Sequence, residues 1–515
     1  MAFTVQREIS CLEKGNSMEK KKLAEYKDWI FRRSAYQMAL SAINFDQQTI
    51  APIGGNAYRD ARCAFLSGEL FDITTEPKIL AIIDELKDDE TADPDDRKAA
   101  QLYSKQANDL LCIPKDEYVA YQNLLNEAYG IWLKAKQQDD YAIFAPTLQK
   151  LIETTKQIYS YRTSDLSLYD RMLDDYEPGM TMAKYDDFFN KLKERLVPLI
   201  AKVTAAEPLK CDFLYREYPV EQQKRFMDEL LKYLHFDPEW GYQNETEHPF
   251  TDWICENDCR ITTKYLPNNV ISAVLSTVHE AGHAYYEHDC DPKYDGMILS
   301  DGISSGMHES QSRLCENYLG RSKAFWEYNF PILQKYFPEQ LGDVTPDMFV
   351  DAINVSEPSL VRTEADELTY PMHILIRYEI EKGLFDGTIA TDHLDEVWNV
   401  KYKEYLGIDV PNAKDGILQD VHWSGGSFGY FPTYALGSAF AAQFVHAMRK
   451  EIDVDEALCS GHYEIVMNWL KEKIHRYGCR YTAEEVLVMA TGEPFNVDYY
   501  LDYLEDKYTK LYHLK

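Results

Sequence analysis

Residues 279–283 read His-Glu-Ala-Gly-His, an arrangement of two metal-binding side chains with a carboxylate beside the first. On a helix, residues four apart lie one turn apart and differ by roughly 40° in azimuth, so His279 and His283 face the same point. Two converging imidazoles suit Zn²⁺, which binds histidine nitrogens at ~2.0–2.1 Å. Glu280 lies about 100° round the helix from His279, where it can act as a base toward water at the metal. The pentapeptide predicts hydrolytic metal chemistry; the alternative is a buried helix whose histidines only bond within the core.

A catalytic zinc site requires a third protein ligand and one open position. Spacing excludes His288, because it follows His283 by five residues and points to another face of the helix. Asp289 and Cys290 come after the helix, and spacing alone does not exclude them.

The stronger candidates for the third ligand lie in the next helical stretch, residues 302–318. His308 and Glu309 are adjacent there, and adjacent helical residues point about 100° apart, so only one of the two can coordinate. Their geometry on the helix does not choose between them.

The segments that must position these side chains read mainly as helices. Residues 270–286 follow Pro267 and have Asn268 or Asn269 as a start signal. Strand signals are few: residues 260–265 are rich in β-branched and aromatic side chains, and 211–218 is a second candidate. Without a repeat or a long linker, we expect one mainly α-helical catalytic unit over residues 1–515, its two lobes interleaved in sequence. Apolar periodicity close to 3.6 residues predicts further helices at 17–45, 97–112, 117–137, 142–162, 184–205, 219–234 and 369–383.

The charge balance limits the partners of this chain of 515 residues. It has 54 basic and 86 acidic residues and a formal net charge of −32, which disfavours nucleic acid and anionic membrane surfaces. Its N-terminal stretch has no apolar secretion signal, and none of its ten cysteines forms a Cys-x-x-Cys pair. We therefore expect a cytoplasmic protein with free, buried thiols.

Five separated motifs between residues 258 and 423 resemble, in order, those of the thermostable carboxypeptidase (carboxypeptidase Taq) family of metallopeptidases. Residues 45–59 and 429–437 are also similar to family segments, so the resemblance spans nearly the whole chain. Val361 and Phe45 stand where isoleucine and tryptophan are usual, and neither bears on the chemistry. The motifs are Asp258-Cys-Arg-Ile-Thr262, His279-Glu-Ala-Gly-His283, His308-Glu-Ser-Gln-Ser-Arg313, Val361-Arg-Thr-Glu-Ala-Asp366 and Gly416-Ile-Leu-Gln-Asp-Val-His-Trp423.

The resemblance implies a largely helical homodimer with a deep groove between two lobes and a small antiparallel β-sheet near the active site. It implies that His279, His283 and Glu309 bind one divalent metal ion per chain, with Glu280 as general base. Zinc is the first choice of ion, and cobalt or manganese are alternatives. A His₂Glu set also matches the oxygen and nitrogen chemistry that zinc accepts.

An enzyme that works from the C-terminus must recognise a free carboxylate, and a guanidinium does so with two parallel hydrogen bonds. In the resembling family, the motifs that contain Arg260 and Arg362 lie at the closed end of the groove. The alternative is that these arginines pair with the neighbouring Asp258 and Asp366. We read Arg313 as a structural salt-bridge residue.

The intermediate of peptide hydrolysis needs donors for its developing oxyanion. The resemblance implies a histidine and a tyrosine here, so His422 and Tyr434 are the expected donors. Tyr430 is the alternative tyrosine and is otherwise expected to bind substrate. Gln419 and Asp420 read as loop-stabilising groups, and Asp420 could orient an imidazole.

The sequence thus predicts a metallocarboxypeptidase that acts on peptides with a free C-terminus. Two alternatives are an oligopeptidase that cuts internal bonds and an inactive peptide-binding protein on the same fold. The presence of Glu280 between two intact metal ligands argues against an inactive protein.

Overall fold

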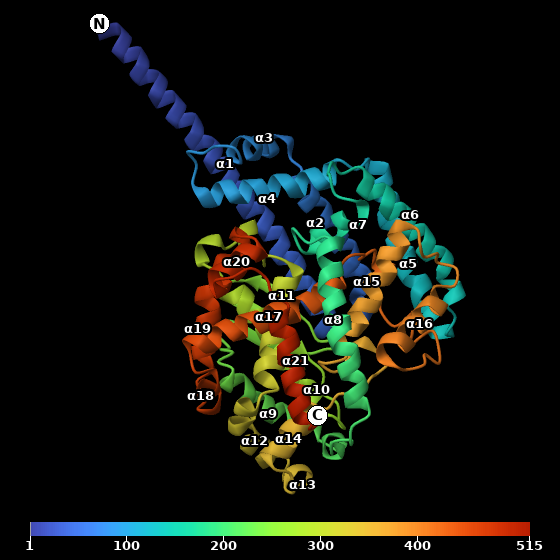
Figure 1. The fold of residues 1–515 in the computed structure, drawn as a ribbon. Coiled ribbons are helices and arrows are strands. Elements are labelled where there is room, and N and C mark those ends of the chain that lie inside the picture. Colours follow the sequence, from blue (N-terminus) through green and yellow to red (C-terminus); the bar gives the residue numbers. More distant parts are fainter. Residues whose placement is uncertain (1) are drawn as a thin grey trace.

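The protein is built almost entirely from helices, with one small β-sheet (Figure 1). The computed structural model describes residues 2–515, with side chains from residue 20 onward, so the predicted thiol state of Cys11 lies outside the described side chains. Every segment with helical periodicity forms a helix, and the predicted helix at 270–286 extends over Val270–His288 (α10). The side chain of Asn269 accepts a hydrogen bond from the Ser272 backbone N–H, which confirms one of the two predicted starts.

The helices fall before and after the sheet. Those before it are α1 (Ala2–Thr49), α2 (Asn56–Thr74), α3 (Pro77–Leu86), α4 (Pro94–Leu111), α5 (Lys115–Gln138), α6 (Ala145–Ser160), α7 (Leu168–Tyr176), α8 (Met182–Thr204) and α9 (Val220–Tyr233). Those after it, besides α10, are α11 (Ser305–Arg313), α12 (Lys323–Tyr336), α13 (Pro338–Leu341), α14 (Pro346–Ile353), α15 (Tyr370–Asp386), α16 (Leu394–Leu406), α17 (Pro432–Glu451), α18 (Val454–Cys459), α19 (Tyr463–Lys473), α20 (Ala483–Thr491) and α21 (Asp498–Leu511).

The sheet has three strands in the order β1-β3-β2, formed by β1 (Gly241–Glu245), β2 (Thr251–Cys255) and β3 (Asp258–Thr263). The predicted strand at 260–265 corresponds to β3. The sheet is mixed and not wholly antiparallel, because β1 pairs with β3 in parallel. The chain reverses direction between successive strands, so β1 and β3 run the same way, and they are neighbours because β3 lies between β1 and β2.

The second predicted strand, at 211–218, is wrong. Residues Asp212–Tyr215 form a short 3₁₀-helix (η3). Tyr218 is buried, and its hydroxyl donates to the carbonyl of Phe213 at 2.7 Å, which closes the segment into a turn. Its apolar side chains therefore fill the core from a turn and not from an extended strand.

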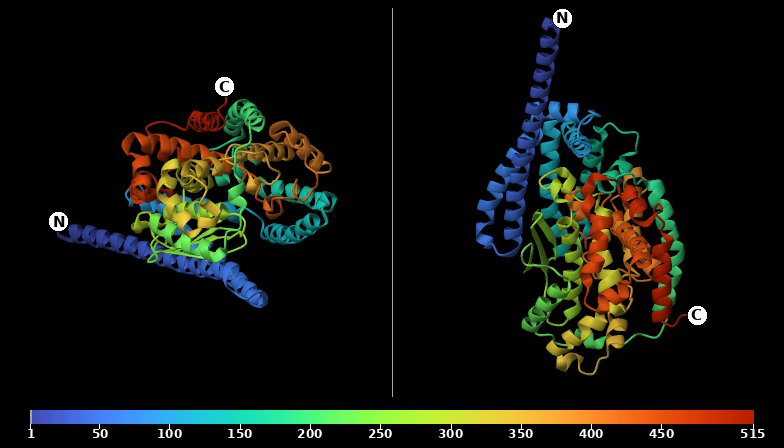
Figure 2. Two further views of the ribbon diagram at one scale, coloured as in Figure 1. Left: turned by 90° about the horizontal axis from the view of Figure 1, so that it is seen from below. Right: turned by 90° about the vertical axis from the view of Figure 1, so that its left-hand side faces the viewer.

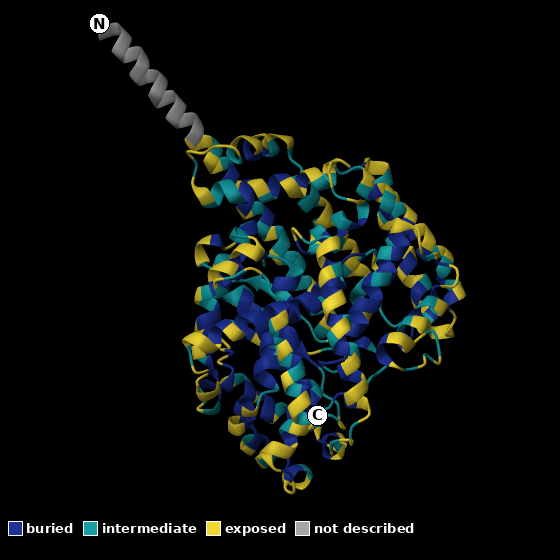
Figure 3. Cartoon of the chain, viewed as in Figure 1, coloured by how far each residue is buried: buried dark blue, intermediate teal, exposed yellow. Residues whose placement is uncertain are grey.

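The interior contains two clusters of buried apolar side chains. The larger one includes residues of α10, α11 and α17 and coincides with the dark centre of the body in Figure 3. The smaller one joins α1, α3 and α4 to the segment after α10, through residues such as Trp29, Tyr103 and Leu299. Helices α1 and α2 pack side by side along one flank of the molecule (Figure 2).

The nine cysteines with described side chains are all free, as expected, but only Cys259, Cys290 and Cys315 are buried. Over the described part of the chain, the structure contains no helix with the length and apolar content needed to traverse a bilayer.

Candidate metal centre

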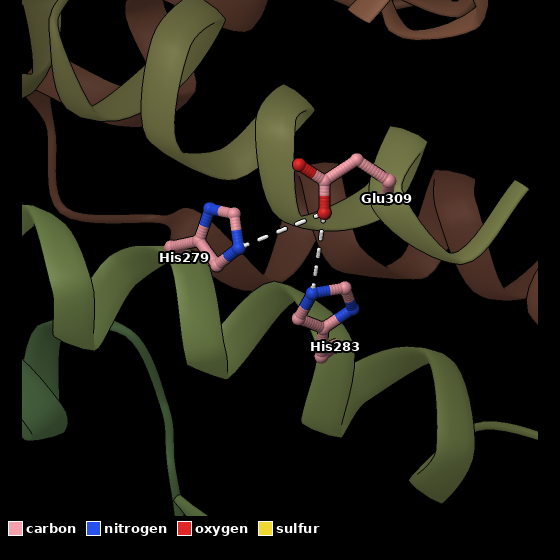
Figure 4. Close-up of side chains that lie close together, drawn as sticks. All are labelled: His279, His283 and Glu309. Atoms are coloured by element: carbon pink, nitrogen blue, oxygen red, sulfur yellow. Dashed lines mark ion pairs between the residues drawn. The ribbon is translucent and has the colours of Figure 1, made fainter. Parts of the chain in front are cut away.

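Helices α10 and α11 bring His279, His283 and Glu309 together around one point (Figure 4). The Glu309 Oε2 atom lies 3.8 Å from His279 Nε2 and 3.6 Å from His283 Nε2. Donors at about 2.1 Å from a tetrahedral zinc ion lie roughly 3.4 Å apart, so these three atoms fit a divalent ion with little movement. Among the described residues, this is the group of histidine and acidic side chains whose ligand atoms converge closely enough to hold a metal.

The helices can approach this closely because glycines occupy their contact points. A Cβ atom at Gly282 would lie 2.7 Å from the carbonyl oxygen of Gln311 on α11. On the other side of α11, a Cβ atom at Gly437 of α17 would lie 2.8 Å from the Glu309 Cβ atom. Because α11 is held between α10 and α17, the Glu309 carboxylate is directed toward the two histidines.

Both histidines have a partner on the ring nitrogen that faces away from this point. His279 Nδ1 lies 2.9 Å from Glu316 Oε2, and His283 Nδ1 lies 2.6 Å from His308 Nδ1. With Nδ1 protonated and bonded, each Nε2 presents its lone pair toward Glu309. The tertiary structure thus chooses between the adjacent candidates: His308 lies behind His283, and Glu309 faces the site.

The other candidate ligands have different partners. His288 stacks on Trp240 with ring centroids 3.9 Å apart and bonds the carbonyl of Glu256. Asp289 pairs with Lys471 and His475, and Cys290 belongs to the smaller apolar cluster.

Arg313 was read from the sequence as a structural salt-bridge residue, and it does form ion pairs, but one of them is with Glu309. Its Nε donates to Glu309 Oε1 at 2.7 Å, and its Nη1 donates to Glu316 Oε2 at 3.2 Å. Although burial alone would raise it, the pKa of Glu309 is held below its ordinary value by Arg313 and the two histidines. The role of Glu316 was missed, although positions 309, 313 and 316 share one helical face and this spacing was visible in the sequence.

Glu280 lies beside the three candidate ligands and is only 7% exposed. Burial raises the pKa of its carboxyl group above the ordinary value. The hydroxyl of Thr251, on β2, lies 2.6 Å from Glu280 Oε2. The small sheet therefore supplies a hydrogen-bond donor that fixes the orientation of this carboxylate, a contact that the sequence did not reveal.

A second group of polar side chains gathers around Tyr434 at the start of α17. Its hydroxyl lies 3.3 Å from His422 Nε2, and its ring contacts that of Tyr430 edge-on, with centroids 5.1 Å apart. Burial, with the nearby charge of Glu309, raises the pKa of both tyrosines. Burial and nearby guanidinium groups lower the pKa of His422 to about 4, so its imidazole is neutral near pH 7. Protonated tyrosines and a neutral histidine are hydrogen-bond donors, as an oxyanion requires.

Arg362 is buried beside this group, and its partner is not the neighbouring Asp366. Its Nε and Nη2 donate to Asp420 Oδ1 at 3.0 and 2.9 Å, and its Nη1 donates to the Tyr370 hydroxyl at 3.0 Å. The Asp366 carboxylate instead bonds Thr369 and backbone N–H groups. These bonds use three of the five N–H groups of a guanidinium, which leaves two further donors on Arg362.

Arg260 pairs with Asp258, as the alternative interpretation expected. Its Nε and Nη2 donate to the two carboxylate oxygens at 2.7 and 2.6 Å. Its side chain is 26% exposed and lies over the ring of Phe45 at 5.3 Å. Arg362 instead lies over the rings of Phe431 and Tyr434, so the two arginines have different aromatic neighbours.

Glu381, on α15, anchors the loop that contains His422 and Tyr430. Its carboxylate accepts hydrogen bonds from Trp423 Nε1 at 2.7 Å and from the Gly429 backbone N–H at 2.8 Å. The hydroxyl of Tyr169 donates to the same carboxylate at 2.8 Å. Sequence spacing gave no signal for this residue, because its partners come from two distant segments, one with Tyr169 and the other with Trp423 and Gly429.

Comparison with known proteins agrees with this geometry. A model of the carboxypeptidase Taq (M32) metallopeptidase family matches residues 25–508. Carboxypeptidase 1 of Bacillus subtilis is 40% identical over 492 residues, which cover 95% of this chain and 98% of the relative. Thermostable carboxypeptidase 1 of Thermus thermophilus is 37% identical and covers 93% of this chain and 97% of its own.

Solved structures show the same relation. The crystal structure of the M32 carboxypeptidase from Deinococcus radiodurans superposes with a TM-score of 0.93 at 32% identity, over 96% of this chain and 100% of that one. The resemblance seen in the separated sequence motifs is thereby confirmed over the whole fold. The chain belongs to the carboxypeptidase Taq (M32) family and is a metallocarboxypeptidase.

Proposed function

We propose that the protein removes C-terminal residues from peptides by metal-dependent hydrolysis, with Glu280 as the general base. The observation that carries this proposal is the convergence of His279, His283 and Glu309 beside a buried Glu280 carboxylate. Family membership supports the reaction class. These three side chains would hold one divalent ion, which we propose to be zinc, with cobalt or manganese as alternatives.

When bound, the ion polarises the scissile carbonyl and lowers the pKa of a water molecule. Glu280 removes a proton from the attacking water, and Thr251 holds the carboxylate in place through its hydroxyl. Glu280 then returns the proton to the leaving amine. Tyr434 and His422 donate hydrogen bonds to the oxyanion, and Tyr430 lines the substrate side of this pair.

Arg362 is the proposed clamp for the terminal carboxylate of the substrate. Its guanidinium is oriented by Asp420 and lies over Tyr434, with its centre 5.0 Å from that ring. A clamp this close to the oxyanion donors selects the last peptide bond, because it limits how far the chain can pass the reacting centre. Arg260 is a second, more exposed candidate for substrate binding.

Replacing Glu309 by Ala is expected to weaken metal binding by more than the ~10–100-fold typical of changes outside the ligand set, because two histidines leave zinc underligated. Metal analysis after dialysis measures this loss. The exposed Glu364→Ala is the matched control and should keep one ion per chain. If Glu309→Ala also keeps its ion, another residue completes the site.

A pair of peptides that differ only at the C-terminus tests the proposed activity. Purified protein supplied with Zn²⁺ or Co²⁺ should release single residues from a free-acid peptide and leave its C-terminal amide intact, as read from product masses. Equal cleavage of both peptides would favour the alternative oligopeptidase, which needs no terminal carboxylate. Tight binding of either peptide without any cleavage would favour the inactive peptide-binding protein.

We also propose a homodimer that uses the outer face of α1 and α2. Large apolar side chains are exposed there, among them Phe31, Met38, Tyr58 and Phe65, and Phe31 is 72% exposed. Burying such a face against a second copy removes apolar area from water, which stabilises the dimer by roughly 25 cal/mol for each Å² buried. Analytical ultracentrifugation of Phe31→Lys and Phe65→Lys should show monomers; a dimer that persists in both would place the interface elsewhere.

The protein is proposed to act in the cytoplasm as one catalytic unit over residues 1–515, on peptides and not on nucleic acid or membranes. The free thiols and the net charge of −32 support this proposal. Fractionation of the producing cells, with the peptidase assay as readout, tests the compartment.

A further inference from the structure

His308 belongs to a strongly hydrogen-bonded chain of side chains that the proposed mechanism does not use. Its Nδ1 lies 2.6 Å from Nδ1 of His283, and its Nε2 lies 2.6 Å from Oε1 of Glu287. Glu287 follows His283 by one helical turn on α10, whereas His308 comes from α11. The chain therefore crosses between the two helices that supply the candidate ligands.

The direction of these hydrogen bonds follows from the role of His283. Its Nε2 faces Glu309, so this nitrogen must keep its lone pair and the ring proton must be on Nδ1. That proton is donated to His308 Nδ1, which therefore accepts. His308 then has its own proton on Nε2 and donates it to Glu287. One arrangement of protons thus satisfies every member, and it ends on a carboxylate.

The surroundings of His308 hold its ring in the position that this chain requires. The ring of Tyr286 contacts it edge-on, with centroids 5.1 Å apart. A Cβ atom at Gly302 would lie 2.8 Å from His308 Cδ2, so the absence of a side chain at 302 makes room for the imidazole.

The two candidate histidine ligands are supported differently. His279 bonds directly to Glu316, a carboxylate that also accepts from Arg313. His283 has no carboxylate on its Nδ1 and reaches Glu287 only through the His308 ring. The orientation of His283 therefore depends on His308 and, through it, on Glu287.

We propose that His308 and Glu287 are positioning residues for the metal. They orient the His283 ring and make its Nε2 a stronger metal ligand, and so set how tightly the ion is held. This inference rests on the proposed metal site, and its primary measurement is zinc affinity and not peptide hydrolysis.

The test uses variants that remove the connection in steps. His308→Leu removes the acceptor for His283, and it is expected to weaken zinc binding by about 10–100-fold, as measured by competition with a chelator. His308→Asn can offer its amide oxygen to His283 but cannot reach Glu287, so its zinc affinity should fall by less than that of His308→Leu. Glu287→Gln keeps an acceptor for His308 without the charge and should lie between wild type and His308→Leu. Combining His308→Leu with Glu287→Gln should add little, because the connection is already broken.

His475 provides a matched control for the removal of a buried histidine. It is fully buried, and its ring nitrogens bond Gln311 on α11 and Asp289, but neither nitrogen bonds His279, His283 or Glu309. His475→Leu should lower the melting temperature of the metal-free protein and leave zinc affinity within about twofold of wild type.

A variant at Gly302 keeps the inference testable if His308→Leu fails to fold. Gly302→Ala should displace the His308 ring without changing any hydrogen-bonding group and should also weaken zinc binding. The inference is overturned if His308→Leu or, failing that, Gly302→Ala and Glu287→Gln bind zinc as tightly as wild type. If wild-type protein itself binds no zinc, the proposed metal site fails, which is a separate outcome.

Discussion

Glu280→Gln is expected to lower kcat by at least ~100-fold while one metal ion per chain is retained, because only the proton acceptor is lost. The amide matches the carboxylate in shape and can still accept a hydrogen bond from Thr251, which lies 2.6 Å from Oε2 in the native protein. It cannot take a proton from water. His279, His283 and Glu309 are unchanged, so the site should load as in the native enzyme.

Metal analysis and steady-state kinetics on the same preparation measure this result. Thr251→Val is an informative companion, because it keeps the base and removes the donor that orients it. Its activity should fall by less than that of Glu280→Gln. Near-native turnover by fully loaded Glu280→Gln would remove this residue from the mechanism.

Arg362→Ala is expected to lower kcat/KM for free-acid peptides by about 100-fold, because loss of the clamp leaves the last peptide bond out of register with the reacting groups. Arg362→Lys retains the positive charge without the two-pronged geometry and should recover only part of the activity. Both variants should still leave a C-terminally amidated peptide intact, because that substrate has no carboxylate for the guanidinium to bind.

The burial of Arg362 demands a control for the fold. Arg362 shares Asp420 with Arg377, whose Nε donates to Oδ2 at 2.7 Å, so Arg362→Ala also weakens an internal ion network. Arg377→Lys perturbs the same carboxylate and should lower the melting temperature, while the preference for free-acid over amidated peptides is retained. Arg260→Ala tests the second candidate for the clamp. If Arg362→Ala leaves kcat/KM for free-acid peptides unchanged and Arg260→Ala does not, the clamp is Arg260.

Local helix geometry made part of the metal centre predictable. His279 and His283 share a face because they are four residues apart, and this holds in any helix. The same rule relates Glu309, Arg313 and Glu316, although their joint contacts were not inferred. The start of α10 at Asn269 was predictable for a similar reason, because an amide oxygen at that position satisfies a free N–H group of the first turn.

Contacts between distant segments decided the rest. Whether His308 or Glu309 completes the site depends on which side of α11 meets α10, and that is set by the close approach at Gly282 and Gly437. The partner of Arg362 is Asp420, which is distant in sequence, and not Asp366, which is near.

The sequence by itself therefore determined the helical class, the pair of histidines with the adjacent carboxylate and, through its separated motifs, the family. Helix spacing left His308 and Glu309 open, the family resemblance implied Glu309, and the packing of α11 places Glu309 opposite the two histidines. The tertiary structure alone decided the mixed order of the small sheet and the pairing of His308 with His283 and Glu287. The physical reason is the distance along the chain over which each kind of contact is fixed. Spacing along a helix fixes neighbours within about two turns, whereas contacts between elements depend on how whole faces pack.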